Sequence, residues 1–232
     1  MNAVEIIKSQ ISKKATIFQT GGFKPTNSTS ESWIGKIYLF KENEEIPIDN
    51  VGRQMIPLAQ INVENIHEKP KSISDTKLIT IFISQDYPLE LAKNGENWLL
   101  REYTDNDKLV VKTIQISNNT IKPFPLKPKP IDKDYPVWDG GGLTSDMEDK
   151  IIELEKSGEI ENYCDITHNE YGHKIGGYPS YCQSGINFGI DFEFTLQIAS
   201  DAKANLNIVD NGTIFLAKNA KTQEWKYYCD FY

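Results

Sequence analysis

Apolar and polar residues alternate with a period of two along several stretches of this chain, which is the pattern of half-buried β-strands. In residues 192–199, for example, the side chains at the even-numbered positions are all aromatic or aliphatic. Residues 78–83 are almost entirely apolar, which predicts a central strand covered on both faces. We therefore predict strands at residues 15–19, 36–40, 56–63, 77–84, 98–104, 109–116, 192–199, 213–217 and 225–231.

Two other stretches have the wider apolar spacing of an amphipathic helix. The first covers the opening residues, whose apolar stripe is Val4, Ile7 and Ile11. The second covers residues 145–157, whose stripe is Met147, Ile151 and Leu154. Ser145 and Glu148 have capping-box spacing at its start, and Gly158 stands where a C-terminal cap belongs. Both stretches predict short helices.

Three short phrases occur twice in the same order, which indicates a duplicated structural unit. They are a Gly-Gly pair with a nearby proline, a glutamine between apolar residues, and a dense apolar run. The repeated residues are Gly21, Gly22, Pro25 and Gln60 in the first copy, and Gly176, Gly177, Pro179 and Gln197 in the second. We expect the copies to superpose, with the glycine pairs in equivalent turns and the glutamines on equivalent strands.

These patterns predict an α+β fold made of two related strand-rich units, with few helices and mostly antiparallel sheets. The expected boundaries are 1–121 for the first unit with its N-terminal helix, 122–144 for a Pro- and Gly-rich connector, and 145–232 for the second unit. Four prolines between residues 123 and 130 favour an extended, stiff path for that connector. At 232 residues, the two units have a length that suits packing as one compact domain.

The repeated glutamines, Gln60 and Gln197, have two interpretations. Buried glutamines commonly satisfy backbone groups of a neighbouring loop, because buried polar groups need partners. The alternative is a ligand site between the two units. We favour the structural interpretation.

Composition predicts a cytoplasmic protein. Apolar residues make up 39% of the chain, enough for a substantial core, and no apolar run is long enough to span a bilayer. The opening residues mix charge into their apolar positions and lack the hydrophobic centre of a secretory signal. The three cysteines, Cys164, Cys182 and Cys229, are an odd number without tight spacing, which fits reduced thiols.

Negative charge is concentrated in one segment. Residues 146–170 contain nine acidic and two basic residues, a net of −7 in a chain whose total is −8. A chain without a basic surface is not expected to bind nucleic acid directly. Most such runs are a solvated helix face, but a surface of one sign also steers a partner of opposite charge. The sharper hypothesis is a docking surface for a basic protein, made by Glu148, Asp149, Glu153, Glu155, Glu159, Glu161 and Asp165.

The residues that could carry chemistry form no standard catalytic pattern. Cys164, His168, His173 and Cys182 could build a tetrahedral zinc site, but they lack the close ligand pairs of structural zinc sites. Cys182 with His173 could be drawn as a hydrolase nucleophile and base, yet nothing marks an oxyanion hole or a nucleophile elbow. We therefore expect no catalytic residues, no metal and no cofactor, and we do not expect an enzyme.

The repeated phrases also resemble those of the bacterial YwqG-like family of uncharacterised proteins. The resemblance rests on residues 21–25, Trp33, residues 57–62 and 79–83 in the first half, and on residues 173–179, Gln183, 196–198 and 210–215 in the second. It implies an internally duplicated α+β fold without established catalytic residues. Members of the family look like immunity proteins of bacterial toxin systems, and the fold is similar to that of eukaryotic chaperone-like proteins that escort a ribosomal protein.

Charge and resemblance together predict a non-enzymatic protein-binding module, in first place an immunity protein that neutralises a cognate basic toxin domain. Two alternatives stay open. One is an enzyme or small-molecule binder with a site between the two units, and the other is a chaperone-like escort protein.

Overall fold

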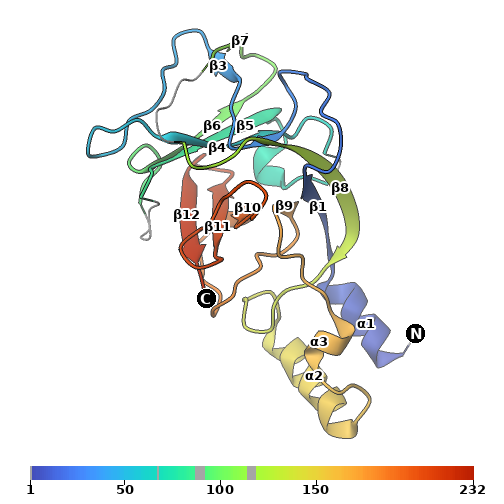
Figure 1. Cartoon of the computed structure of the whole chain (residues 1–232). Helices are drawn as coiled ribbons and strands as arrows, with labels where there is room; N and C mark the ends of the chain where they lie inside the picture. The colour runs from blue at the N-terminus through green and yellow to red at the C-terminus, as the bar shows by residue number, and fades with distance from the viewer. Residues whose placement is uncertain (1, 67, 87–91, 114–118) are drawn as a thin grey trace.

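The computed structural model describes residues 2–66, 68–86, 92–113 and 119–232. Its centre is a ten-stranded sheet with the strand order β12-β11-β10-β9-β1-β8-β2-β4-β5-β6. The ladders of this sheet are antiparallel. The fold is therefore strand-rich and mostly antiparallel, with helices confined to short parts of the chain (Figure 1).

The sheet divides into two half-sheets with a pair of long strands between them. The first half-sheet contains β2 (Trp33–Ile34), β4 (Ile56–Asn62), β5 (Leu78–Ile83) and β6 (Trp98–Tyr103). The second contains β9 (Lys174–Gly176), β10 (Phe192–Ala199), β11 (Thr213–Asn219) and β12 (Trp225–Asp230). The central pair is β1 (Lys13–Thr20) and β8 (Phe124–Asp134). Each half-sheet runs outward from this pair in sequence order.

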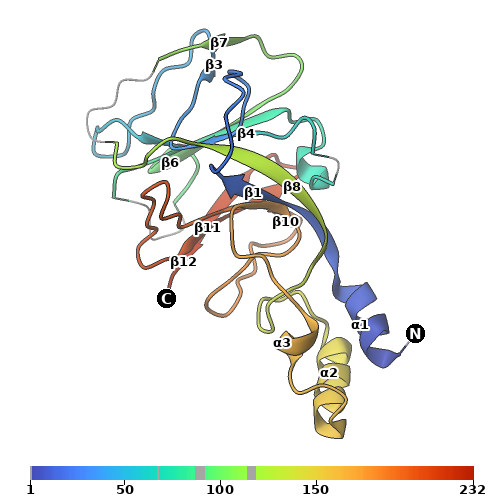
Figure 2. The same cartoon turned by 45° about the vertical axis from the view of Figure 1, so that its right-hand side comes forward.

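The two central strands are exchanged between the half-sheets. β1 precedes the first half-sheet in the chain but pairs with β9 of the second, while β8 pairs with β2 of the first. β1 and β8 also pair with each other along most of their lengths, as Figure 2 shows. Neither half-sheet is therefore bordered by the long strand that directly precedes it in sequence.

β8 occupies the segment that we predicted to be a connector. The prolines do extend the chain, as expected, but the extended segment lies in the middle of the sheet. Its pairing with β2 covers only Phe124 and Pro125, so the later part of β8 has β1 on one side alone. A proline lacks the N–H that a ladder needs and is tolerated where one side of a strand is open. Pro128 and Pro130 stand in that later, exposed part.

The main core lies between the two half-sheets, which face each other in Figure 1. It combines Ile81, Ile83 and Leu100 of the first with Ile198 and Leu216 of the second, all of them buried. The outermost strands also meet across it, since the Trp98 and Tyr227 rings are 5.5 Å apart. Burial of this surface from both sides is what makes the two half-sheets one folded body.

The outer faces of the half-sheets are covered differently. On the first, the small sheet of β3 (Leu39–Lys41) and β7 (Leu109–Val111) lies over a cluster that includes Phe40, Met55 and Phe82. On the second, Tyr181 packs 4.7 Å from Phe215, which lies 6.2 Å from Tyr228. A short 3-10 helix, η1 (Lys71–Ile73), precedes β5.

Three helices form a lobe that projects from the end of the sheet (Figures 1 and 2). They are α1 (Ala3–Ile11), α2 (Ser145–Ser157) and α3 (Tyr163–Ile166), and they share a small core of Ile7, Ile11, Tyr135, Ile151, Leu154, Ile160 and Tyr163. The N-cap of α2 is Thr144, whose side chain accepts from Met147 N–H, and not Ser145 as predicted. Gly158 closes α2 in the left-handed conformation, as expected.

Most predicted strands are observed with small shifts at their ends. The strand at 192–199 has the predicted bounds, whereas the strand expected at 36–40 is limited to β3. Of the strand expected at 109–116, β7 is observed and residues 114–116 lie outside the described part of the chain. We did not predict β2, β8, β9 or α3.

Within the residues that the structure describes, no helix combines the length and the apolar character needed to cross a membrane.

Candidate functional site

Gln60 is completely buried and ties two loops to the first half-sheet. Its Oε1 accepts from the backbone N–H groups of Tyr38 (2.9 Å) and Leu39 (3.1 Å). Its Nε2 donates to the carbonyls of Thr29 (2.8 Å) and Glu31 (2.9 Å). Backbone groups therefore occupy all the donor and acceptor positions of the Gln60 amide.

Gln197 has a similar role in the second half-sheet, although one of its partners is a side-chain hydroxyl. Its Oε1 accepts from Ser180 N–H (3.1 Å), and its Nε2 lies 2.8 Å from the Gly172 carbonyl and 2.6 Å from Ser180 Oγ. A longer contact of 3.4 Å joins Nε2 to the Glu170 carbonyl. Both glutamines thus act as the favoured interpretation expects, and neither amide is available to a ligand.

The two glutamines also have the same surroundings. Gln60 pairs with Trp33 of β2, and Gln197 pairs with Lys174 of β9. Each Nε2 reaches the carbonyls two and four residues before that partner. Each strand carries a register shift two residues before the glutamine, at the positions of Leu58 and Thr195.

The repeated glycine pairs do not fall at matching positions. Relative to the glutamines, Gly176 matches Gly35, and both have a φ of 72°. Gly21 instead follows β1, where its N–H donates to the Pro125 carbonyl. The sequence expectation that Gly21 and Gly22 superpose on Gly176 and Gly177 is therefore not met by the register, although the glutamines do match.

Behind Gly177 lies a fully buried ion pair. Lys174 Nζ is 2.9 Å from Asp134 Oδ2, and both side chains have 0% exposure. Asp134 also accepts from the backbone N–H groups of Tyr178 (2.8 Å) and Glu170 (3.0 Å). Burial lowers the pKa of Lys174, and the Asp134 carboxylate opposes that shift. A Cβ at Gly177 would overlap Asp134 Oδ2, which explains why this position is a glycine.

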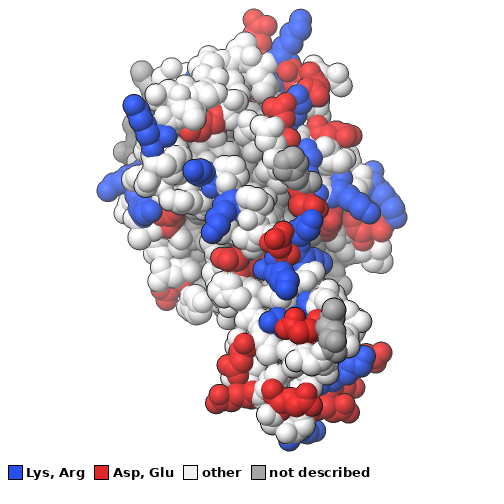
Figure 3. Space-filling model, turned by 90° about the vertical axis from the view of Figure 1, so that its right-hand side faces the viewer, with Lys and Arg blue, Asp and Glu red and all other residues white. Residues whose placement is uncertain are grey.

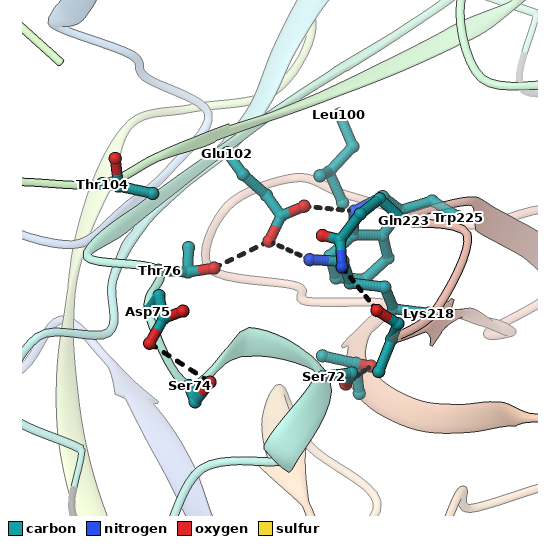
Figure 4. A network of polar contacts seen from close by, with 12 residues as sticks. Ser72, Ser74, Asp75, Thr76, Leu100, Glu102, Thr104, Lys218, Gln223 and Trp225 are labelled. Carbon is teal, nitrogen blue, oxygen red and sulfur yellow. Dashed lines mark hydrogen bonds and ion pairs between the residues drawn. The ribbon is translucent and has the colours of Figure 1, made fainter. Parts of the chain in front are cut away.

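A second polar cluster joins the edges of the two half-sheets (Figure 4). Glu102 of β6 accepts from Thr76 Oγ1 (2.7 Å), from Lys218 Nζ of β11 (2.8 Å) and from Trp225 Nε1 of β12 (2.8 Å). Deeper along the same seam, the hydroxyls of Ser72 and Thr195 lie 3.3 Å apart. Both carboxylate oxygens of Glu102 are thereby engaged, so this cluster is a structural tie between the half-sheets.

The acidic residues of segment 146–170 lie on the helical lobe, where Figure 3 shows red side chains gathered. Two of them have structural roles. Glu155 Oε1 accepts from Tyr163 N–H (2.9 Å), and Asp165 Oδ2 accepts from Asn162 N–H (2.9 Å) at the start of α3. Glu148 is partly buried, and the five exposed members of the predicted surface are Asp149, Glu153, Glu159, Glu161 and Asp165.

A groove of about 460 Å³ runs between α1 and α2 beside these acids. Its floor is apolar and includes Ile6, which is 44% exposed, together with Ile7 and Leu154. Glu153 and Glu159 line it as well. An apolar groove with carboxylates along it matches a segment that carries both apolar and basic side chains.

The proposed zinc ligands are not brought together. Cys164 and His168 are exposed on or near the lobe, whereas His173 is buried in the second half-sheet. Within the described part of the chain, no group of three or more His, Cys, Asp or Glu side chains could hold a metal ion.

His173 and Cys182 are not arranged as a base and a nucleophile. His173 Nδ1 accepts from Ala199 N–H (3.1 Å), and its Nε2 lies 3.2 Å from Asp201 Oδ2. Burial and the nearby Asp230 carboxylate raise the pKa of the Cys182 thiol to about 11, which disfavours the reactive thiolate at neutral pH.

Sequence reasoning missed the buried pair of Lys174 with Asp134 and the seam residues Glu102, Lys218 and Trp225. A lysine two residues before a Gly-Gly pair was a visible signal for the first. No local pattern marked Glu102, because two of its partners, Lys218 and Trp225, come from segments more than a hundred residues away in the chain.

A family model described as a domain of unknown function (DUF1963) matches residues 33–224. The match begins at the first residue of β2 and ends just before β12, so it takes in the first half-sheet, β8, α2 and the second half-sheet without β12. A search of curated proteins found no match to the chain.

Proposed function

The chain belongs to the DUF1963 family of domains of unknown function, and from that premise we propose that it is a non-enzymatic, cytoplasmic protein-binding module. Its binding surface is the helical lobe, and its partner is a basic protein. The observation that carries this proposal is the groove between α1 and α2, which combines an apolar floor with exposed carboxylates on a projecting part of the molecule.

The apolar floor and the acids have different roles in such an interface. Insertion of an apolar side chain between Ile6 and Leu154 supplies the buried centre that holds a complex together. Asp149 and Glu161 stay at the exposed rim, where charge mainly changes the association rate and its salt dependence. An acidic surface of this kind attracts proteins whose own function requires a basic cleft.

The finer proposal is that the partner is a toxin domain that acts on nucleic acid, so that the chain is its immunity protein. The support is the resemblance of the repeated phrases to the YwqG-like family, together with the charge that complements a phosphate-binding cleft. A chaperone-like escort role uses the same surface and differs in the partner alone.

We also infer that the two half-sheets descend from a duplicated unit. Support comes from the matching glutamine hydrogen bonds, the register shift at the same distance from each glutamine, and the same strand order outward from the central pair. The alternative function, a site between the units, has less support, because the amides of Gln60 and Gln197 are buried and already hydrogen-bonded within the protein.

The first step of the test is to establish whether a toxin domain is encoded beside the chain's own gene, and the proposal predicts that one is. That domain is then expressed together with the chain in a bacterium. The wild-type chain is expected to restore growth. The lobe variant replaces four of the exposed acids by lysine, at Asp149, Glu153, Glu159 and Glu161. Glu155 and Asp165 are left unchanged because they hold α3 in place.

A matched control carries the same four charge reversals away from the lobe, at the exposed residues Glu42, Asp75, Asp210 and Glu224. We expect the lobe variant to lose protection and to associate about tenfold more slowly at low salt, because steering by charge is lost. The control should behave as the wild type does. Protection by the lobe variant at the level of the control would show that another surface binds the toxin.

A further inference from the structure

A cavity of about 430 Å³ lies beside the first half-sheet, away from the helical lobe. It is bounded by the loop between β1 and β2, by the turn after β4 and by β8. Its wall includes Phe23, Lys24, Glu31, Asn62, Ile66 and Lys127. This volume is in the range of pockets that hold small ligands.

The corresponding corner of the second half-sheet is closed by the protein's own side chains. There, His173 accepts from Ala199 N–H and its Nε2 contacts Asp201. Lys203 crosses the same corner and donates to the Thr20 carbonyl of β1 (2.8 Å). The corner is therefore filled by an imidazole and the stem of a lysine.

The first half-sheet has the same hydrogen bond to the backbone but a smaller side chain at this corner. Ser32 stands where His173 stands, and its Oγ accepts from Asn62 N–H at 2.9 Å, as His173 Nδ1 accepts from Ala199 N–H. Counting from the glutamines, Ile66 stands where Lys203 stands. Replacement of an imidazole by a hydroxymethyl group leaves space, and the cavity lies where that space is expected.

The groups around the cavity are poorly matched with one another. Oε2 of Glu31 is buried without a hydrogen-bond partner in the described part of the chain, which is costly for a carboxylate oxygen. Lys24 and Lys127 are exposed and form no ion pair with a described residue. Lys127 Nζ lies over the Phe23 ring at 6.0 Å, and Ile66 and Leu126 supply buried apolar surface.

We propose that this cavity binds a small carboxylate with an apolar side chain. The carboxylate pairs with Lys24 and Lys127, and the side chain lies against Phe23 and the apolar wall of Ile66 and Leu126. An apolar α-amino acid, either free or as the last residue of a peptide, has both of these groups. The site is separate from the lobe, so its failure would leave the proposed partner surface untouched.

The experiment measures binding to the full chain by titration, with three probes. They are leucine, N-acetyl-leucine and N-acetyl-leucinamide, which has no carboxylate. Leucine or N-acetyl-leucine should bind at least fivefold more tightly than the amide. Tighter binding of leucine identifies a free amino acid as the ligand, and tighter binding of N-acetyl-leucine identifies a peptide C-terminus.

Variants locate the probe. Lys127→Gln should weaken binding about two- to fivefold, in line with an exposed ion pair, while Lys127→Arg should keep it. Lys129→Gln is the matched control, because Lys129 is exposed on the same strand and does not line the cavity. Ser32→His copies the closed corner of the second half-sheet and should abolish binding.

Two results would overturn the proposal. The first is no binding of either carboxylate probe by the folded wild-type chain, or equal binding of the amide. The second is binding that Ser32→His and Lys127→Gln leave unchanged, with circular dichroism showing that both variants are folded.

Discussion

The two half-sheets share a set of backbone hydrogen bonds made by a buried glutamine, and they differ at one corner of the sheet. Gln60 and Gln197 hold equivalent loops through equivalent hydrogen bonds, and a glycine with a φ of 72° follows β2 and ends β9. At this corner, the second half-sheet buries His173 with Asp201, and the first leaves a cavity at Ser32. The comparison teaches that backbone hydrogen bonding fixes the shared part, whereas the side chains at two positions, His173 and Lys203 against Ser32 and Ile66, distinguish the closed corner from the open one.

The largest expected effect concerns the residues that face the two glutamines. Lys174→Met leaves the Asp134 carboxylate buried without its cation, so the free energy of unfolding should fall by about 3–5 kcal/mol. Trp33→Met, at the matching position, removes packing alone and should cost about 0.5–3 kcal/mol. Urea denaturation measures both.

The double variant Lys174→Met with Asp134→Leu is the control for this experiment. Because it removes both charges together, it should recover part of the lost stability. If the single and double variants were equally unstable, packing around Lys174 would be the main loss.

Replacement of either glutamine should lower the free energy of unfolding by a similar amount. Gln60→Leu and Gln197→Leu each leave buried backbone groups without a hydrogen-bond partner. An unsatisfied group costs about 1–3 kcal/mol. We expect both variants to lose about 2–4 kcal/mol in denaturant unfolding, and to agree with each other within about 1 kcal/mol. A large loss in one variant and none in the other would break the equivalence of the two half-sheets.

Replacement of the two matching glycines, Gly35 and Gly176, by alanine should lower stability by different amounts. Alanine at φ 72° costs about 1–2 kcal/mol, and this cost applies to Gly176→Ala, whose added Cβ would meet nothing closer than 3.4 Å. Gly35→Ala bears the same strain and also places its Cβ 2.9 Å from Ile121 Cγ2 and from the Lys122 carbonyl. Thermal unfolding should therefore show the lower midpoint for Gly35→Ala.

The smallest effect is a pH dependence confined to the closed corner. His173 holds the pKa of the Asp201 carboxyl well below its ordinary value near 3.9, helped by Thr20 and Ala204 N–H. A carboxyl with a lowered pKa in the folded state stabilises the fold above its unfolded value, and this contribution is lost as pH falls through the folded value. Asp201→Asn should therefore lower the urea midpoint at pH 6, with a difference that shrinks below about pH 4.

Glu64 is the matched residue in the first half-sheet, since both acids stand four positions after their glutamine. It pairs with Lys77 at the surface, at 2.8 Å. Glu64→Gln should change the urea midpoint little at either pH, because exposed pairs contribute little. An acid-sensitive difference in this variant as large as that of Asp201→Asn would contradict the assignment.

Periodicity in the sequence was enough to predict the strands that are long and regular. β10 has the predicted bounds, and β4, β5, β6, β11 and β12 differ from prediction by a few residues at most. β2 and β9 are too short to show a period of two, and they exist because β8 and β1 pair with them. β8 was missed because prolines usually exclude a strand, and only tertiary context leaves one of its sides open.

The candidate sites were predictable to different extents. The acidic surface of the lobe could be predicted from the sequence, because its acidic residues lie close together and helix α2 has its own cap signals. The role of Glu155 and Asp165 in holding α3 could not be predicted, because α3 spans only four residues. The cavity at Ser32 was invisible in the sequence, because it depends on how His173 and Ser32 compare once the two half-sheets are aligned by register.

The exchange of β1 and β8 has a consequence for how the chain folds during synthesis. Thr16 of β1 can pair with Ile175 of β9 only after most of the polypeptide has left the ribosome. β2 can pair with β8 only after residues 124 and 125 have been synthesised. Pairings so distant in sequence raise the contact order and slow folding. A nascent chain ending at residue 121 would hold β1 without either of its sheet neighbours and β2 without β8. We expect such a chain to depend on chaperones until the second half emerges.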